Sequence, residues 1–315
     1  MFKIFPQFEE DLLIRLFHKG VKAQWTVEDV EWQQPLMMED AQARALAHML
    51  TPVYLGEQSA MIGASVVLPQ MAMAGETTSQ IYLSSFLMDE ARHFEVLTQL
   101  YRRLEEDPLN VRQMPAMLRY HNRLRKGDRI DWVWGILISD VFAKNFYQIF
   151  SRSQPEALFG SLSGRILQDE SRHQAFAEHY LKRAVPSLEP ERLVALKKMK
   201  DDLLGTMDNM YTHLLEDAKR LDIDGRVFLD DLRAEIEHKA NRIGLNDRHG
   251  NGSDDMTERI TRPGGPNVFQ GIGDGVKSAT KDLSSKFQAL KASKCDTCFV
   301  ALLCRTRLVT TARCI

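Results

Sequence analysis

The sequence lacks the features that mark several large classes of protein. It has only 4 cysteines in 315 residues, all between Cys295 and the end of the chain, so no disulfide framework can hold its main body together. No apolar run reaches the roughly 18 residues of a membrane-spanning helix. The first residues also lack the pattern of a signal peptide. We therefore expect a cytoplasmic protein without a membrane span.

An excess of charge of one sign is also missing. The 41 basic and 43 acidic residues leave a formal net charge of −2, which argues against a nucleic-acid-binding protein. Apolar residues make up 44% of the chain and charged residues 27%, which is typical of globular proteins with a large core. The length allows about two domains of roughly 150 residues each.

Strand signals are scarce, because alternation of apolar and polar residues is nowhere sustained. Apolar residues at helical spacing occur instead in one segment after another. We predict an all-α bundle, with Pro52 and Pro69 as kinks or breaks and Pro155 in the first turn of its helix. The predicted helices cover about residues 8–20, 38–74, 77–104, 111–124, 129–151, 155–184, 189–221 and 225–243.

The composition changes near residue 244. Eight glycines and two prolines lie between Gly244 and Gly275, which is typical of a linker. We predict a helical domain at 1–243, a linker with a possible short helix at 244–294, and a tail at 295–315. A flexible tail with reactive thiols is favoured over a metal site, a thiol redox site or a partner-docking segment. The tail cysteines are Cys295, Cys298, Cys304 and Cys314.

The pattern that carries chemistry is Glu-x-x-His, which places a carboxylate and an imidazole on one face of a helix. It occurs three times. Two occurrences share the longer pattern Asp-Glu-x-Arg-His, at 89–93 and 169–173, and both lie in long helices with strong apolar periodicity. The third, Glu235 with His238, lies in a highly charged helix, and we interpret it as solvated surface.

A di-metal site on two such helices needs one carboxylate from each of two further helices. Glu57 and Asp140 each place a charge inside an apolar stretch, 33 residues before Glu90 and 30 residues before Glu170. Buried unpaired carboxylates are costly, so such groups are usually paired or bind metal. The predicted ligands are Glu57, Glu90, His93, Asp140, Glu170 and His173.

Other readings stay open for the two added carboxylates. Asp140 can pair with Lys144 at i+4, and Glu57 can lie near the start of a helix that begins again after Pro52. Asp131 is the other acidic residue of its helix, but it lies near the helix start and is interpreted as a cap.

The aspartates of the two motifs have a predicted role as well. A metal-bound imidazole usually donates its other N–H group to a carboxylate. We predict that Asp169 supports His93 and that Asp89 supports His173. The alternative is that both aspartates face solvent or pair with arginine.

These residues resemble the ferritin-like di-metal carboxylate superfamily. More narrowly, they resemble the small subunit of class I ribonucleotide reductase and the related ligand-binding oxidases, over about residues 10–185. The segment at 23–32 is similar to the Trp-x-Pro-x-Asp-Ile motif of that family. Trp25 would then extend a relay from His93 through Asp169, although a core or capping aromatic is the alternative.

The sequence also departs from these families. Leu97 stands where the radical-generating small subunits have a tyrosine, and Ser59 stands where the related oxidases have a valine that is crosslinked to a tyrosine. Ile166 replaces the third histidine of some N-oxygenating relatives. The resemblance is therefore to the superfamily and does not select one member.

The resemblance implies a ferritin-like four-helix bundle with additional N- and C-terminal helices. Carboxylate and imidazole ligands suit two iron ions, or one manganese and one iron. The implied function is an O2-activating oxidase, hydroxylase or N-oxygenase that acts on a small organic substrate and takes electrons from an external donor. A homodimer is implied as well.

Other functions stay open. The alternatives are a reductase-like radical generator without the usual tyrosine, a non-catalytic metal-binding protein and a scaffold that has lost its metal. Six large apolar side chains could line a substrate pocket, but we favour a core role for them. They are Met61, Phe86, Trp132, Trp134, Phe142 and Phe146.

Overall fold

The computed structural model describes residues 11–124 and 126–246, and all regular secondary structure in this part of the chain is helical, without a strand. The all-α prediction is confirmed. The eight α-helices of the described part are α1 Asp11–Lys22, α2 Asp40–Met73, α3 Thr77–Leu104, α4 Pro115–Leu124, α5 Arg129–Ser153, α6 Leu158–Ala184, α7 Pro190–Arg220 and α8 Gly225–Arg242. Short 3-10 helices lie at Val27–Asp29, Val111–Gln113 and Val185–Ser187.

The two prolines of α2 do not break the helix. Helix α2 continues through both Pro52 and Pro69, so Glu57 lies well inside a helix and the alternative reading, a helix that begins again after Pro52, is wrong. Packing outweighs the local penalty of proline here, because much of α2 is buried. Helix α6 begins at Leu158, so the prediction of Pro155 in its first turn is also wrong.

Specific capping groups fix the ends of the long helices. Helix α2 ends in a Schellman motif, in which Gly75 at φ +76° donates to the Ala72 carbonyl and Glu76 donates to the Met71 carbonyl. Asp128 caps the start of α5, and Asp131 accepts a hydrogen bond from the Asp128 N–H group in return. The interpretation of Asp131 as a capping residue is therefore correct.

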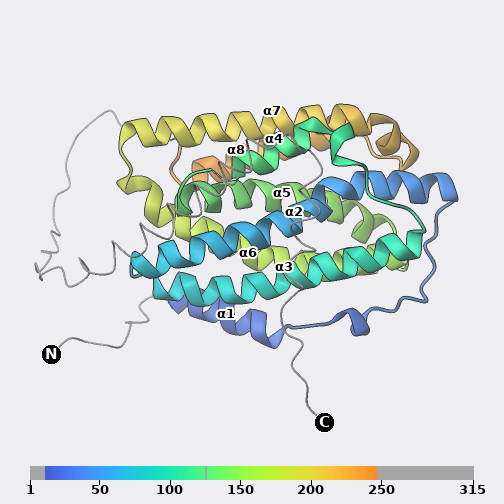
Figure 1. Ribbon diagram of the computed structural model, residues 1–315, viewed down its shortest axis with the longest axis horizontal. Helices are drawn as coiled ribbons and strands as arrows, with labels where there is room; N and C mark the ends of the chain where they lie inside the picture. The colour runs from blue at the N-terminus through green and yellow to red at the C-terminus, as the bar shows by residue number, and fades with distance from the viewer. Residues whose placement is uncertain (1–10, 125, 247–315) are drawn as a thin grey trace, which may run out of the picture. The chain divides into compact units, whose positions relative to one another are not determined.

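Four helices form the central bundle (Figure 1): α2 packs along α3, and α5 packs along α6. Helix α1 covers α3 and α6 on one side, while α4 and α7 pack against α2 and α5 on the other. A close approach between α2 and α5 depends on Gly63, where an added Cβ would lie 1.8 Å from Trp132 Nε1. None of the described helices combines the length and apolar character needed to cross a membrane.

The predicted linker and tail lie almost wholly outside the described residues. Only 244–246 of the linker are described. The four cysteines of the tail, at 295, 298, 304 and 314, are not.

Candidate metal centre

The six predicted ligand residues come together inside the central bundle. Glu57 lies on α2 and Asp140 on α5, while each Glu-x-x-His pair occupies one face of α3 or α6. None of the six is more than 6% exposed. Their side chains form two groups, in each of which one ligand atom per residue lies within 4.8 Å of the others. These groups are Glu57, Glu90, His93 and Glu170, and Asp140, Glu170 and His173.

Glu170 belongs to both groups, as a bridging ligand of a di-metal centre would. His93 Nδ1 lies 3.4 Å from Glu57 Oε2 and 3.6 Å from Glu170 Oε1. On the other side, His173 Nδ1 lies 3.1 Å from Glu90 Oε1 and 3.6 Å from Glu170 Oε2. Both imidazoles therefore turn Nδ1 toward the carboxylates.

The opposite nitrogen of each histidine faces the aspartate of the other motif. His93 Nε2 lies 3.1 Å from Asp169 Oδ2, and His173 Nε2 lies 3.3 Å from Asp89 Oδ2. Such a contact fixes both the tautomer and the orientation of a ligand histidine. The two motifs thus support each other across the interface between α3 and α6.

The motif arginines connect the same two aspartates. Arg92 Nη2 lies 2.5 Å from Asp89 Oδ1 and 2.8 Å from Asp169 Oδ2. Arg172 Nη2 lies 2.5 Å from Asp169 Oδ1 and 3.0 Å from Asp89 Oδ2. We call these four side chains the Asp–Arg brace. All four are buried, and their two positive charges balance the two negative charges, as buried ionic groups require.

Residues before Val27 complete one side of this brace. Trp25 Nε1 donates to Asp169 Oδ2 at 2.9 Å, and the Arg92 guanidinium lies 4.8 Å from the centre of the indole ring. Gln24 accepts from Arg92 at 2.6 Å and donates to Asp89 at 3.2 Å. His93, Asp169 and Trp25 therefore form a continuous chain of contacts.

A tyrosine contacts the centre from α5. Tyr147 Oη donates to Glu57 Oε1 at 3.4 Å, and its ring is fully buried. Burial and the charge of Glu57 raise the pKa of Tyr147 well above its ordinary value, so the phenol stays protonated and neutral. Tyr147 lies seven residues after Asp140, two helical turns later on the same face of α5.

The closely spaced carboxylates of the centre shift one another's pKa values. Burial and the charge of Glu57 raise the pKa of Glu90 well above its ordinary value, and burial and the charge of Glu170 do the same for Asp140. Burial opposes protonation of His93, but the charge of Glu57 and the contact with Asp169 outweigh it and raise the pKa of His93. Like charges at such short range need a proton or a cation between them.

The donor set fits a metal pair. Four buried ligand atoms have no hydrogen-bond partner: His93 Nδ1, His173 Nδ1, Asp140 Oδ2 and Glu170 Oε2. Buried polar atoms are normally satisfied, so four unsatisfied atoms in one cluster call for a further group. Carboxylate and imidazole donors in this number suit iron or manganese.

The structure decides how Lys144 and the third Glu-x-x-His pattern are paired. Lys144 Nζ pairs with Glu235 Oε1 at 2.5 Å, so the proposed ion pair between Asp140 and Lys144 is wrong. Glu235 is consequently half-buried in an ion pair and is not freely solvated, whereas its motif partner His238 is exposed. Neither belongs to the two ligand groups.

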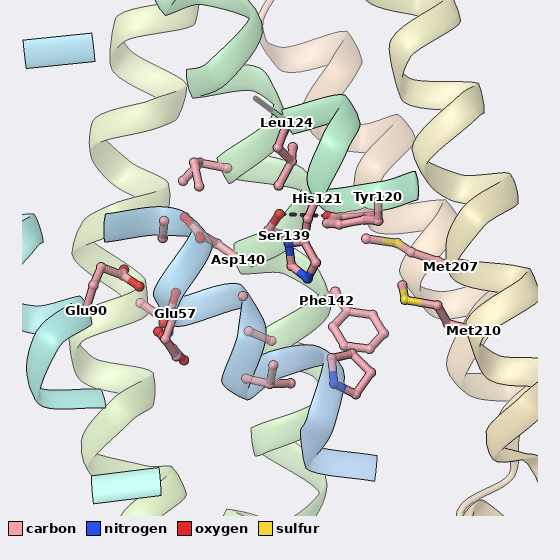
Figure 2. Close-up of a pocket in the computed structure, with 17 residues that line it drawn as sticks. Glu57, Glu90, Tyr120, His121, Leu124, Ser139, Asp140, Phe142, Met207 and Met210 are labelled. Atoms are coloured by element: carbon pink, nitrogen blue, oxygen red, sulfur yellow. Dashed lines mark hydrogen bonds between the residues drawn. The ribbon is translucent and has the colours of Figure 1, made fainter. Parts of the chain in front are cut away.

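A cavity of about 50 Å³ adjoins the centre (Figure 2). It reaches from the carboxylates of the central bundle to residues of α4 and α7. Of the six large apolar side chains considered for a pocket, Phe142 lines this cavity. Phe86, Trp132, Trp134 and Phe146 are buried in the core, and Met61 is half-buried.

The sequence reasoning missed several residues of the site. Pairing of the motif aspartates with arginine was considered only as an alternative to their contact with histidine, whereas Asp89 and Asp169 make both kinds of contact, with Arg92 and Arg172 as well as with the histidines. Tyr147 could have been found from its spacing to Asp140. Tyr120 and Ser139, which line the cavity, carry no signal in the sequence, because only the packing of α4 on α5 brings them together.

Comparisons with known proteins agree with this architecture. No protein-family model matches the sequence, and no curated protein matches it. Solved structures do match. An R2-like ligand-binding oxidase reconstituted anaerobically with manganese and iron has 17% identity and a TM-score of 0.59 over 76% of this chain and 94% of its own.

Two further structures of R2-like ligand-binding oxidases give the same result. One, reconstituted with two irons, has 17% identity and a TM-score of 0.60 over 76% of this chain and 94% of its own. Another, with manganese and iron, has 19% identity and a TM-score of 0.56 over 76% and 93%. The chain thus has the ferritin-like fold of the R2-like ligand-binding oxidases, with a buried carboxylate–histidine cluster at its centre.

Proposed function

We propose that this protein is an O2-activating di-metal oxidoreductase that uses two iron ions, or one manganese and one iron, to oxidise a small organic molecule. The observation that carries the proposal is the pair of buried ligand groups that share Glu170 and contain four atoms without hydrogen-bond partners. The solved structures with this fold carry manganese–iron or two-iron cofactors, which supports the choice of metals.

Each metal has a candidate set of ligands. Glu57, Glu90, His93 and Glu170 would hold one ion, and Asp140, Glu170 and His173 would hold the other. When bound, such a metal pair supplies electrons to O2 and oxidising power toward an organic substrate. Metal binding requires deprotonated carboxylates and neutral imidazoles, so it would displace the protons that the cluster otherwise shares.

The other residues of the site position these ligands. Asp169 and Asp89 accept the Nε2–H groups of His93 and His173, which leaves each Nδ1 free to bind metal. The contacts with His173 and His93 hold the pKa of Asp89 and of Asp169 below the ordinary value despite their burial, so both aspartates stay ionised. Burial of the whole cluster excludes bulk water. Tyr147 donates to Glu57 and fixes the orientation of that carboxylate.

One alternative function has a specific observation in its favour. A radical generator needs an oxidisable side chain beside the centre, and the usual position is taken by Leu97. Tyr147 offers a buried phenol in contact with Glu57. In that case, exposure of the iron-loaded protein to O2 would give a tyrosyl radical signal in electron paramagnetic resonance, and Tyr147→Phe would abolish the signal.

The leading proposal is tested by O2 uptake. Protein loaded anaerobically with Fe(II) and mixed with O2 should consume O2 in proportion to the amount of chain. His93→Ala and His173→Ala should lose this uptake, whereas His238→Ala, in the third Glu-x-x-His pattern, should keep it. Uptake that is no faster in the unaltered protein than in His93→Ala would contradict the proposal.

The expected partners are also proposals. The resemblance of the sequence supports an external electron donor, a homodimer and a cytoplasmic location. Sedimentation of the purified protein tests the dimer, and reduction of the oxidised centre by candidate reductases tests the donor.

A further inference from the structure

A second pocket, larger than the cavity beside the metal centre, lies between α5, α6 and α8. We call it the α6–α8 pocket. Its volume is about 530 Å³, which is within the roughly 300–1,000 Å³ of pockets that bind small molecules. Gln174 lines it and donates through Nε2 to the Asp140 carbonyl at 3.2 Å. The pocket therefore lies near the centre, but the proposed function does not use it.

Basic side chains predominate among the charged groups that line the α6–α8 pocket. Among the described residues, Glu178 is the only carboxylate of the lining. The whole chain has a formal net charge of −2, so the basic side chains are a local concentration and do not follow from composition. Such a concentration attracts ligands of the opposite charge. The basic side chains are Lys144, Lys182, Lys239 and Arg242.

Two carboxylates contact three of these four basic side chains. Glu178 is buried and pairs with Lys239 through one oxygen, while Arg242 Nη2 lies 3.0 Å from the other oxygen. Lys144 pairs with Glu235 at 2.5 Å. Because Glu178 serves two basic side chains, its single negative charge balances only one of them.

Lys182 is the fourth basic side chain. It is exposed, and it has no ion-pair partner among the residues that the structure describes. The neighbouring His179 adds no charge, because burial and the charge of Lys182 lower the pKa of its imidazole. The four basic side chains and the two carboxylates thus leave two positive charges unbalanced.

Apolar side chains form another part of the lining. Leu12, Leu167 and Ala175 line the same pocket. A small inorganic ion would fill only part of this volume and would leave these side chains in contact with water. A ligand with an organic group beside its anionic group would cover both kinds of surface, and burial of the organic group would add to the affinity.

A phosphate monoester has the charge that matches this lining. Its second pKa is about 6, so it carries nearly two negative charges at pH 7.5. Its three terminal oxygens accept strong hydrogen bonds from lysine and arginine. A carboxylate or a sulfate monoester carries only one negative charge and would balance half of the excess.

We propose that the α6–α8 pocket binds a phosphate monoester of a small organic molecule, with the phosphate group against Lys182 and Arg242. The organic group lies against Leu12, Leu167 and Ala175. The side chains that carry this inference are not metal ligands, so it does not depend on the proposed di-metal function.

The experiment is isothermal titration calorimetry of the full chain at pH 7.5 and low ionic strength, where exposed charges are least screened. The probes are phenyl phosphate, phenyl sulfate and inorganic phosphate. Phenyl sulfate has nearly the shape of phenyl phosphate but one negative charge fewer, and inorganic phosphate lacks the organic group. Metal-free and metal-loaded protein are both titrated, because phosphate groups also bind metal ions.

We expect one phenyl phosphate to bind per chain, about tenfold more tightly than phenyl sulfate and more tightly than inorganic phosphate. The affinity should be the same with and without metal. Lys182→Gln and Arg242→Gln should each weaken binding about fivefold, as expected for one exposed charge pair. Both side chains are exposed, so neither change should impair folding.

Arg152→Gln is the matched control. Arg152 lines a different pocket between α5 and α8, together with three aspartates. The substitution removes the same charge from a place that does not favour an anion, so the affinity for phenyl phosphate should stay the same.

Several results would overturn the proposal. Equal affinities for phenyl phosphate and phenyl sulfate would contradict the charge argument, and inorganic phosphate that binds as tightly as phenyl phosphate would identify the free ion as the ligand. An affinity that is unchanged in both Lys182→Gln and Arg242→Gln, or that needs the metals, would place the ligand elsewhere. Absence of phenyl phosphate binding would contradict the proposal directly.

Discussion

The two halves of the centre share a motif but differ in what surrounds it. Asp-Glu-x-Arg-His occurs once on α3 and once on α6, and its members make the same contacts across the bundle in both directions. We call the surroundings of His93 the α3 half and those of His173 the α6 half. In the α3 half, Tyr147 donates a hydrogen bond to Glu57, and Trp25 donates one to Asp169. The α6 half has the shorter Asp140, whose Oδ2 lacks a hydrogen-bond partner, and Phe86 against His173.

The comparison distinguishes the residues that hold the two histidines from those that make the two metal positions different. The repeated motif builds the symmetric part of the site, which holds both histidines in the same way. The residues outside the motif are not repeated, so they make the two metal positions chemically different. Glu57 accepts a hydrogen bond from the Tyr147 phenol, whereas Asp140 Oδ2 has no hydrogen-bond partner.

Breaking the Asp–Arg brace should give the largest effect. Arg172 is 2% exposed and contacts both aspartates, so Arg172→Leu would leave buried negative charge without its partner. We expect a loss of about 3–5 kcal/mol in the free energy of unfolding, measured by urea denaturation of the metal-free protein.

A matched change on the surface is the control for the brace. Arg233 pairs with Asp208 at a position where 44% of the arginine side chain is exposed. Arg233→Leu should therefore cost at most about 1 kcal/mol. Equal losses for Arg172→Leu and Arg233→Leu would contradict the structural role of the brace.

Trp25→Phe tests the half that contains Asp169. The change removes an indole hydrogen bond to a carboxylate at 2.9 Å, for which we expect a loss of about 1.5–3 kcal/mol. Trp32→Phe is the comparison, since Trp32 Nε1 donates to the neutral Val27 carbonyl at 2.8 Å, and its loss should be about 0.5–1.5 kcal/mol. Urea denaturation of both variants measures the difference, and a larger loss for Trp32→Phe would contradict the account.

Asp140→Glu should have the smallest effect on stability. The added methylene makes this half more similar to the other, and the adjoining cavity offers room for it. We expect the free energy of unfolding to change by less than about 1 kcal/mol and the metal content to stay the same. Elemental analysis checks the metal, and loss of either metal would show that the shorter carboxylate is required.

The sequence predicted the fold well because its signals are local and repeated. The helices of the central bundle follow from apolar periodicity, and their predicted ends deviate by few residues, as at α5. The errors are a break of α2 at Pro52 or Pro69, which the packing of α2 prevents, and the start of α6, which Pro155 does not determine. Helix propensity is a property of the single residue, so it does not include the effect of such tertiary packing.

The predicted site followed from one repeated pattern and two isolated charges. The motif placed Glu90, His93, Glu170 and His173 on helix faces, and the structure brings Glu57 and Asp140 to them. The cavity could not be predicted, because Tyr120 and Ser139 meet only through the packing of α4 on α5. A hydrogen bond between residues that are far apart in the sequence produces no periodic sequence pattern.

The central claim is that this cluster holds two metal ions. The most direct measurement is the metal content per chain after anaerobic loading with iron and manganese, by elemental analysis. The account predicts about two tightly held ions in the unaltered protein and in His238→Ala, and fewer in both His93→Ala and His173→Ala. Fewer than one ion in the unaltered protein, or full metal content in both of the motif histidine variants, would contradict it.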